Sequence, residues 1–225
     1  MISPAMQRYA AEIHRLQQDH PYVPLSMLAE QVDVSLQAAS RMIRRLKEAG
    51  LVVHEPYRGV RLTPEGERIA LPSIRRHRLI EVFLVRVMRF DWEEIHDLAD
   101  VLESGIDQVL EDRIDELTGR PAHCPHGDPI PTRDGVMPPV TDVSLVTLDP
   151  GVAGRISRVR THDPDKLRYL AELELVPGVD FRLESRAPFN GPLRIRIGNE
   201  EHVIGHELAA TLWVEPTASQ RQDAN

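Results

Sequence analysis

The chain has 225 residues, 41% of them hydrophobic but only 4% aromatic, and a formal net charge of −8. That length suffices for two modest or three small domains, and no apolar run approaches the ~20 residues that a membrane-spanning helix needs. The single cysteine, Cys124, excludes an intrachain disulfide framework, and residues 1–10 contain no apolar signal-peptide region, so we expect a soluble cytoplasmic protein without a membrane partner.

The charge is distributed unevenly along the chain. Residues 1–72 contain nine Lys and Arg against eight Asp and Glu, a net charge of +1, so the rest of the chain carries −9. Residues 91–116 contain eleven acidic residues and one basic residue. This asymmetry favours an anionic partner near the N-terminus and a cation in the middle of the chain.

Residues 3–63 follow the order of elements in a winged helix-turn-helix. The expected elements are helices over residues 3–18, 25–32 and 36–49 and β-prone runs over residues 51–55 and 59–63. Apolar residues repeat at helical spacing, Ser3 can cap the first helix, and Gly50 can end the third. Helix, helix, turn, helix and hairpin is the order of this DNA-binding fold.

The third helix and the tip of the hairpin carry side chains that favour DNA binding. Gln, Ser and Arg at a helix N-terminus can reach base edges in the major groove, and a basic wing can contact phosphates. The candidate DNA-binding residues are Ser35, Gln37, Ala38, Ser40, Arg41, Arg44, Tyr57, Arg58 and Arg61. A winged helix used only for protein contacts is the alternative, but the joint placement of helix and basic loop favours double-stranded DNA.

The middle of the chain is predicted to be helical. A helix follows Thr63, with a break or kink expected at Pro72. Residues 74–90 are apolar over more than one helical face, which predicts burial against a second copy of the chain. Two amphipathic helices follow, one beginning at Asp91 and one ending at Gly119.

The remainder of the chain changes character. Residues 120–142 contain six prolines and are predicted to form a loop. Residues 143–216 alternate short β-prone pieces with turn residues and include one helical stretch, residues 163–175, which is typical of a small five-stranded barrel. Residues 217–225 form a polar tail.

Five segments together resemble the diphtheria toxin repressor family of metal-dependent transcriptional regulators, which includes manganese regulators. They are residues 28–52, 55–70, 75–84, 95–104 and 123–131. The specific combination is HRLIEVFL followed by IHDLADVLE in two successive helices, because a winged helix alone occurs in many families. The C-terminal part resembles the SH3-like barrel of ferrous-iron transport accessory proteins.

The elements and the resemblance together predict a mainly α protein with a small β domain. The expected domains are a winged helix-turn-helix DNA-binding domain over residues 1–72, a helical metal-binding and dimerisation domain over residues 73–139, and a linker, SH3-like barrel and tail over residues 140–225. The resemblance implies a homodimer that binds Mn²⁺ or Fe²⁺, in up to two sites per subunit. It implies that the metal-bound dimer binds a palindromic operator and represses metal-uptake genes.

The resemblance implies one metal site built from His77, Glu81 and His96. An oxygen ligand from the barrel completes such sites, and here it falls near Asp163. The alternative is a pair of unrelated surface histidines, because His and Glu one turn apart are common on helices.

A second site in the family takes two ligands that correspond to Asp100 and Glu103. The family also places a histidine after that glutamate and a carboxylate or Met on the first helix, where this chain has Ser104 and Arg8. The resemblance to manganese regulators implies Cys124 as a possible ligand here, and His123 or His126 beside it could replace the lost histidine. Alternatively the site is lost, and Arg8 forms a salt bridge with Asp100 or Glu103. Both options remain open.

Helix geometry separates the two sites. His96 and Glu103 lie seven residues apart, or about 10 Å along a helix, so one cation cannot bind both. Oxygen ligands with one or two imidazoles suit Mn²⁺ and Fe²⁺, whereas a cysteine ligand shifts preference toward Fe²⁺, Zn²⁺ or Co²⁺. The competing functions are a winged-helix regulator that has lost metal sensing and responds to a protein partner through its barrel, and a metalloenzyme. We expect no enzyme, because no general base, nucleophile pair or phosphate loop accompanies the ligands.

Overall fold

The computed structural model describes residues 2–18 and 20–217, and the chain divides into two compact units. The first unit comprises Met1–His77 and Pro131–Pro138, and the second comprises Arg78–Ile130 and Pro139–Asn225. Among the described residues, no helix combines the length and apolar character that crossing a membrane requires. The predicted polar tail lies outside the described part from residue 218 onward.

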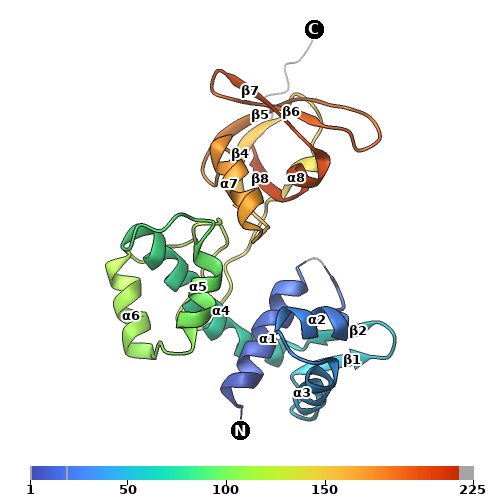
Figure 1. Ribbon diagram of the computed structural model, residues 1–225, viewed down its shortest axis with the longest axis vertical. Coiled ribbons are helices and arrows are strands. Elements are labelled where there is room, and N and C mark those ends of the chain that lie inside the picture. Colours follow the sequence, from blue (N-terminus) through green and yellow to red (C-terminus); the bar gives the residue numbers. More distant parts are fainter. Residues whose placement is uncertain (1, 19, 218–225) are drawn as a thin grey trace. The chain divides into compact units, whose positions relative to one another are not determined.

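The first unit contains the winged helix-turn-helix that the sequence predicts. Its elements are α1 (Pro4–Leu16), α2 (Leu25–Gln31), α3 (Leu36–Glu48), β1 (Val52–Glu55) and β2 (Gly59–Leu62). Figure 1 shows the three helices beside the two-stranded hairpin. The hydroxyls of Ser3 and Ser35 cap α1 and α3 by accepting from Met6 N and Ala38 N at 3.3 and 3.2 Å, which satisfies backbone donors that a helix start leaves open.

The core of this unit forms where the apolar faces of α1, α2 and α3 meet. Ile13, Leu28 and Leu46 are completely buried, and each such side chain contributes about 1.5–3 kcal/mol to folding. The wing is tied to this core through Gly59, which adopts φ +124° beside Val23. A Cβ at position 59 would lie 2.3 Å from the Val23 carbonyl oxygen, so only glycine allows this approach.

Helix α4 (Pro64–Arg86) passes through Pro72 without interruption. Of the break or kink expected at this position, the break is therefore wrong. A proline inside a helix costs about 3 kcal/mol, but Ile69, Ala70 and Ile74 on either side of it are buried in the core of the first unit. Burial of these residues offsets the lost backbone hydrogen bond.

The apolar side chains of α4 pack mostly against other parts of the same chain. Leu79 and Val82 pack with Ile114, Cys124 and Ile130 in one buried cluster. A second cluster joins the opposite side of α4 to the next helix through Ile80, Leu84, Ile95 and Ala99. The sequence suggested a second copy as the partner of this helix, whereas its own loop and neighbouring helices cover most of it.

Helices α5 (Ile95–Glu103) and α6 (Gln108–Leu117) follow α4. Helix α5 begins four residues later than predicted, because Asp91 and Glu94 form a turn before it. Asp107 caps α6 by accepting from Leu110 N at 2.9 Å. Several apolar side chains of these two helices remain exposed: Leu98, Val101, Leu102, Val109, Leu110 and Leu117.

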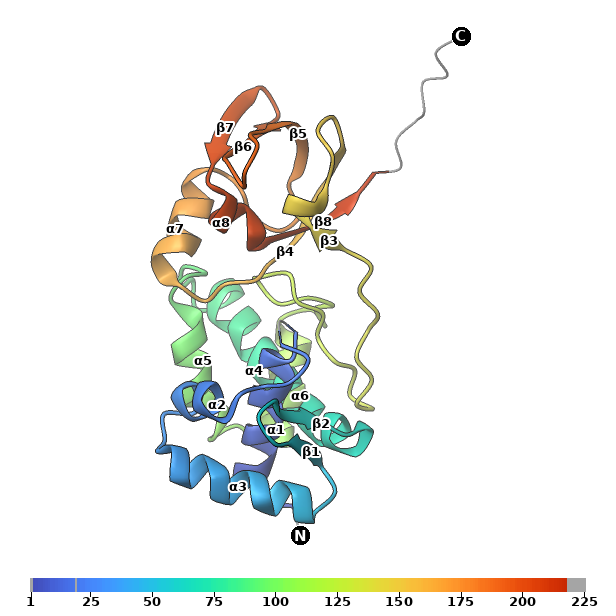
Figure 2. The same ribbon diagram turned by 90° about the vertical axis from the view of Figure 1, so that its right-hand side faces the viewer.

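The barrel is an antiparallel sheet of six strands in the order β3-β8-β4-β5-β6-β7, one more than predicted. Its elements are β3 (Val143–Ser144), β4 (Ala153–Val159), α7 (Pro164–Glu172), β5 (Asp180–Arg186), β6 (Leu193–Ile197), β7 (Glu200–Ile204), α8 (His206–Ala210) and β8 (Leu212–Pro216), with a short 3₁₀ turn at Leu145–Thr147. Figures 1 and 2 show the curved strands with α7 and α8 beside them. The two-residue β3 and five-residue α8 are too short for a periodicity signal.

Candidate functional site

Three side chains of the second unit form a buried cluster: Glu81, Cys124 and His126. A carboxylate oxygen, the thiol sulfur and an imidazole nitrogen all lie within 4.8 Å of one another. These side chains are only 2%, 6% and 1% exposed. Glu81 comes from α4, whereas the other two come from a turn that we name the cysteine loop (residues 123–129). A hydrogen bond of 2.9 Å from Cys124 N to Asp128 O closes this loop.

The orientation of His126 leaves a lone pair facing the Glu81 carboxylate. His126 Nε2 lies 3.0 Å from the Trp92 carbonyl oxygen, which only accepts, so Nε2 carries the hydrogen. His126 Nδ1 lies 3.6 Å from Glu81 Oε1, too far for a hydrogen bond, and it has no hydrogen-bond partner among the described residues. A carboxylate, a thiol and an imidazole nitrogen that are gathered in a buried site are ligand types that a divalent metal ion binds. The donor set therefore fits a divalent metal.

The protonation of the cluster follows from its burial and charge. Burial alone would lower the pKa of His126, but the Glu81 carboxylate and the Trp92 carbonyl outweigh it, and the pKa is raised. Burial, with help from the Glu81 and Asp128 carboxylates, raises the pKa of the Cys124 thiol well above its ordinary value. Without a metal, the cluster therefore holds protons that a metal must displace.

Other imidazoles surround this cluster. His96 of α5 places Nδ1 3.4 Å from Glu81 Oε1, and His77 lies one turn before Glu81 on α4 with 3% exposure. His162, between β4 and α7, stacks on His96 with ring centroids 3.8 Å apart and meets His126 edge-on at 5.7 Å. The structure thus brings Glu81 and His96 together as predicted, and it adds His162.

Sequence reasoning missed His162 and named its neighbour Asp163 as the barrel ligand. Asp163 is the N-cap of α7, where one carboxylate oxygen accepts from Asp165 N and Lys166 N at 3.0 and 3.2 Å. Capping explains this aspartate without any metal. The stacking of His162 on His96 is a tertiary contact that no spacing pattern in HDPD predicts.

The acidic side chains of α5 occupy a different environment. Asp100 is exposed and Glu103 half-buried, and a carboxylate oxygen of Asp100 lies within 4.8 Å of an imidazole nitrogen of His96. Ser104 ends the helix, and its hydroxyl donates to Val101 O at 3.4 Å. The structure places Cys124 and His126 at Glu81, so these residues support the site that sequence reasoning had assigned to His77, Glu81 and His96.

The predicted DNA-binding residues lie on α3 and the wing of the first unit. Gln37, Arg41 and Arg44 are exposed on α3, while Ser35 is committed to capping that helix. At the tip of the wing, Tyr57 is fully exposed at φ +65°. Exposed cations on one helix and one hairpin are what phosphate contact requires.

Two residues that sequence reasoning missed hold the wing cations in place. The Tyr22 hydroxyl donates to the Glu55 carboxylate, and Arg58 contacts both, with its Nη1 2.8 Å from Glu55 Oε2 and its guanidinium 4.1 Å from the Tyr22 ring centroid. Arg61 lies 5.7 Å from the same centroid. The only sequence signal was an aromatic residue between two prolines in PYVP.

Family models match almost the whole chain. Residues 1–60 match the N-terminal DNA-binding domain of iron-dependent repressors, and residues 63–132 match their metal-binding and dimerisation domain. Residues 143–216 match the FeoA domain. The HTH-type transcriptional regulator MntR of Bacillus pumilus is 32% identical over 117 residues, which cover 52% of this chain and 81% of that protein. The chain belongs to the diphtheria toxin repressor and MntR family.

Relatives of this family also match over the full length. The iron-dependent repressor IdeR of Mycobacterium tuberculosis is 28% identical over 219 residues, covering 92% of this chain and 95% of that protein. A solved structure described as a manganese-dependent transcriptional repressor in complex with manganese is 36% identical, with a TM-score of 0.86 over 94% of this chain and 100% of the other. The predicted family and three-part fold are confirmed.

Membership also decides the broad class of function. The family consists of metal-dependent transcriptional repressors and not of enzymes, so the chain is a DNA-binding regulator and the metalloenzyme alternative is set aside.

Proposed function

We propose that this chain is a cytoplasmic dimeric repressor of transcription. It binds a palindromic operator in double-stranded DNA when Mn²⁺ or Fe²⁺ occupies the cluster around Glu81. Metal-uptake genes are the expected targets, because repression at high metal then limits further uptake. The observation that carries the proposal is the buried set of potential metal ligands formed by Glu81, Cys124 and His126, whose ligand atoms lie within 4.8 Å of one another.

The proposed ligands come from three segments of the chain. His77 and Glu81 lie one turn apart on α4, His96 lies on α5, and Cys124 and His126 lie in the cysteine loop. A bound divalent cation provides the positive charge that balances the Glu81 carboxylate and a Cys124 thiolate. Glu81 then holds Nδ1 of His96 and of His126 toward one point, which fixes α4, α5 and the loop relative to one another. Asp100 and Glu103 remain candidates for a second ion, and loss of that site to Arg8 remains the alternative.

The proposed dimer forms through the exposed apolar side chains of α5 and α6. Six exposed aliphatic residues on adjacent helices favour a partner surface. A stable interface of this kind buries more than about 1,000 Å² in total. Light scattering should give twice 25.5 kDa at micromolar concentration, and a monomer with and without metal would contradict the dimer.

The wing is proposed to contact the phosphate backbone through Arg58 and Arg61, while Arg41 and Gln37 reach the major groove. Replacing Arg58 and Arg61 with Ala should lower the salt dependence of operator binding by about one unit of slope per lost phosphate contact. An unchanged slope would exclude the wing from the interface.

The test of the whole proposal is a titration of operator binding against Mn²⁺, followed by fluorescence anisotropy of a labelled duplex. We expect tight binding only with metal, and loss of that dependence in Glu81→Gln. Equal operator binding with Mn²⁺ and with a chelator would instead support a regulator that no longer senses metal. Zn²⁺ and Fe²⁺ titrations in parallel identify the preferred ion.

A further inference from the structure

The cysteine loop rests directly on strand β4 of the barrel. Val159 N donates to the His126 carbonyl oxygen at 2.8 Å. Gly127, at φ +90°, touches the same strand so closely that a Cβ there would lie 2.0 Å from Ser157 O. The backbone that carries Cys124 and His126 is therefore placed by the barrel and not by the helices alone.

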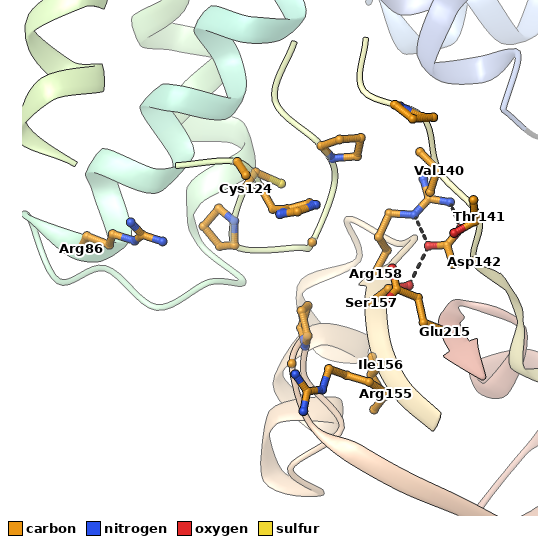
Figure 3. Close-up of a pocket in the computed structure, with 18 residues that line it drawn as sticks. Arg86, Cys124, Val140, Thr141, Asp142, Arg155, Ile156, Ser157, Arg158 and Glu215 are labelled. Carbon is orange, nitrogen blue, oxygen red and sulfur yellow. Dashed lines mark hydrogen bonds and ion pairs between the residues drawn. The ribbon is translucent and has the colours of Figure 1, made fainter. Parts of the chain in front are cut away.

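Beside this contact the loop and the barrel are separated by open space. A cleft of about 610 Å³ is lined by Cys124 and Pro125 of the loop and by Asp142, Ser157 and Arg158 of the barrel side. Figure 3 shows Cys124 of the loop and Asp142, Ser157 and Arg158 of the other wall. Close packing cannot fix the loop where there is a cleft, so polar contacts must do so.

Arg158 of β4 supplies such a contact. Its Nε and Nη2 each donate to Asp142 at 2.7 Å, as Figure 3 shows, and its Nη1 lies 3.3 Å from Asp128 Oδ1 in the cysteine loop. Asp128 Oδ2 lies 3.7 Å from Nη2 of Arg78 on α4. Arg78 also donates to the Pro129 carbonyl oxygen at 2.5 Å. Arg78, Arg158 and Asp142 are buried and Asp128 is partly buried. The row Arg78, Asp128, Arg158 and Asp142 joins α4, the loop, β4 and the linker.

The charges of this row depend on one another. Burial would lower the pKa of Arg158, but Asp142 and Asp128 outweigh it and raise the pKa, so Arg158 stays charged. A buried ion deprived of its partner is strongly destabilising. Displacement of the loop from β4 would leave Arg158 and Arg78 without the Asp128 carboxylate between them.

Building on the metal site of the proposed function, we propose that Arg158 is a positioning residue for the metal: by bridging Asp142 and Asp128 it holds the cysteine loop on β4, so that Cys124 and His126 face Glu81. Barrel docking and metal binding then stabilise each other, because linkage between two events is reciprocal. Arg158 of the barrel therefore raises the metal affinity by holding the loop, although Arg158 is not itself a metal ligand.

The experiment measures Mn²⁺ affinity by calorimetry on the full-length chain. Arg158→Gln should weaken binding about 10–100-fold, the range typical of residues that orient metal ligands. Arg158→Lys, which keeps the charge but loses the two-pronged contact, should restore part of the affinity. Arg155→Gln is the matched control, because Arg155 lies on the same strand, lines the same cleft and forms an exposed pair with Asp180 of β5.

A second readout uses the Cys124 thiol in metal-free protein. The thiol is 6% exposed, so it should react slowly with Ellman's reagent in the wild type and in Arg155→Gln, and several-fold faster in Arg158→Gln. Asp128→Asn should give the same two effects while retaining the pair of Arg158 and Asp142. This variant therefore carries the test if Arg158→Gln fails to fold.

Two negative results have different meanings. Wild-type Mn²⁺ binding that persists unchanged in Arg158→Gln and Asp128→Asn, with unchanged thiol reactivity, overturns the positioning role alone. A wild-type chain that binds no divalent metal overturns the proposed function together with the positioning role. If Arg155→Gln weakens Mn²⁺ binding as much as Arg158→Gln does, the positioning role is also overturned. Such a result would show a general effect of charge near the cleft.

Discussion

Two sets of potential ligands lie close together in the second unit, and they differ in burial. The cluster of Glu81, Cys124 and His126 is almost completely buried, while Asp100 is exposed and Glu103 is half-buried. Water can satisfy an exposed carboxylate, so an acidic helix face is stable without metal. Glu81 Oε1 has the ring nitrogens of His96 and His126 3.4 and 3.6 Å away, so these ligand types are gathered out of water. Burial, and not the number of acidic residues, therefore distinguishes the site that we propose for the metal.

The two sets also differ in how many segments they join. Asp100 and Glu103 belong to one helix, whose geometry is fixed by its own backbone. Glu81, His126 and His96 come from α4, the cysteine loop and α5, which meet only in the folded protein. Metal binding at the buried cluster can therefore change the relative stability of whole segments, whereas binding on α5 alone cannot.

The largest expected effect separates the two sets directly. Glu81→Gln should weaken Mn²⁺ binding by at least about 100-fold, above the range for residues that only orient ligands. Glu103→Gln makes the same chemical change on α5 and should leave binding to the buried cluster within about threefold, because a partly exposed charge is screened. Calorimetry measures both. Loss of binding in Glu103→Gln with retention in Glu81→Gln would reverse the assignment.

The next effect concerns pH. Because the pKa of Cys124 is well above its ordinary value, metal binding should release the thiol proton at neutral pH, which changes the affinity about tenfold per pH unit. The raised pKa of His126 adds a second proton at lower pH, so the slope should approach two there. Cys124→Ser should remove one unit of slope at all pH values. A slope near zero would exclude displacement of protons from the cluster.

The same shift has a consequence for the metal-free protein. A raised folded-state pKa of His126 contributes stability that is present below the unfolded value of about 6.5 and is lost as pH rises through the folded value. Metal-free protein should therefore lose stability between slightly acidic and slightly alkaline pH, and saturating metal should reverse that trend. Thermal melts at several pH values, with His126→Gln as control, measure it.

A smaller effect tests the preference among metals. Cys124→Ser should weaken Zn²⁺ or Co²⁺ binding about tenfold more than Mn²⁺ binding, because thiolate suits the softer cations. In the wild type, Co²⁺ should give a sulfur-to-cobalt charge-transfer band that disappears in Cys124→Ser. A band that survives the substitution would place the ion away from the cysteine loop.

The smallest effect concerns the barrel. Asp163→Ala removes the cap of α7 and should cost about 1 kcal/mol of stability, with Mn²⁺ affinity unchanged. Asp163→Ser, which can still cap, should restore most of that stability. A large loss of affinity in both variants would show that Asp163 is a ligand after all, as the family resemblance suggested.

Local patterns of the sequence predict many of the helices. The cap at Ser3, the helix-ending glycines Gly50 and Gly119 and the helical spacing of apolar residues predict α1, α3 and α6 to within a few residues. Such signals survive in a single sequence because they arise from interactions within one or two turns. The same reasoning failed at Pro72, where burial of neighbouring residues in the core overrides a local helix breaker.

The family motifs in the sequence also indicated a metal site at His77, Glu81 and His96, since these residues lie at helical spacing in two successive helices. The partners of Cys124 and His126 were decided only by tertiary structure. A loop rich in proline has no periodicity from which to infer its direction, so sequence could attach it equally well to Asp100 and Glu103. The cysteine loop lies against β4, where Gly127 approaches Ser157 closely and Val159 N donates to His126 O at 2.8 Å, and in this position Cys124 and His126 lie beside Glu81. The same contact brings His162 to His96 across 66 residues of sequence, a juxtaposition that no local pattern encodes.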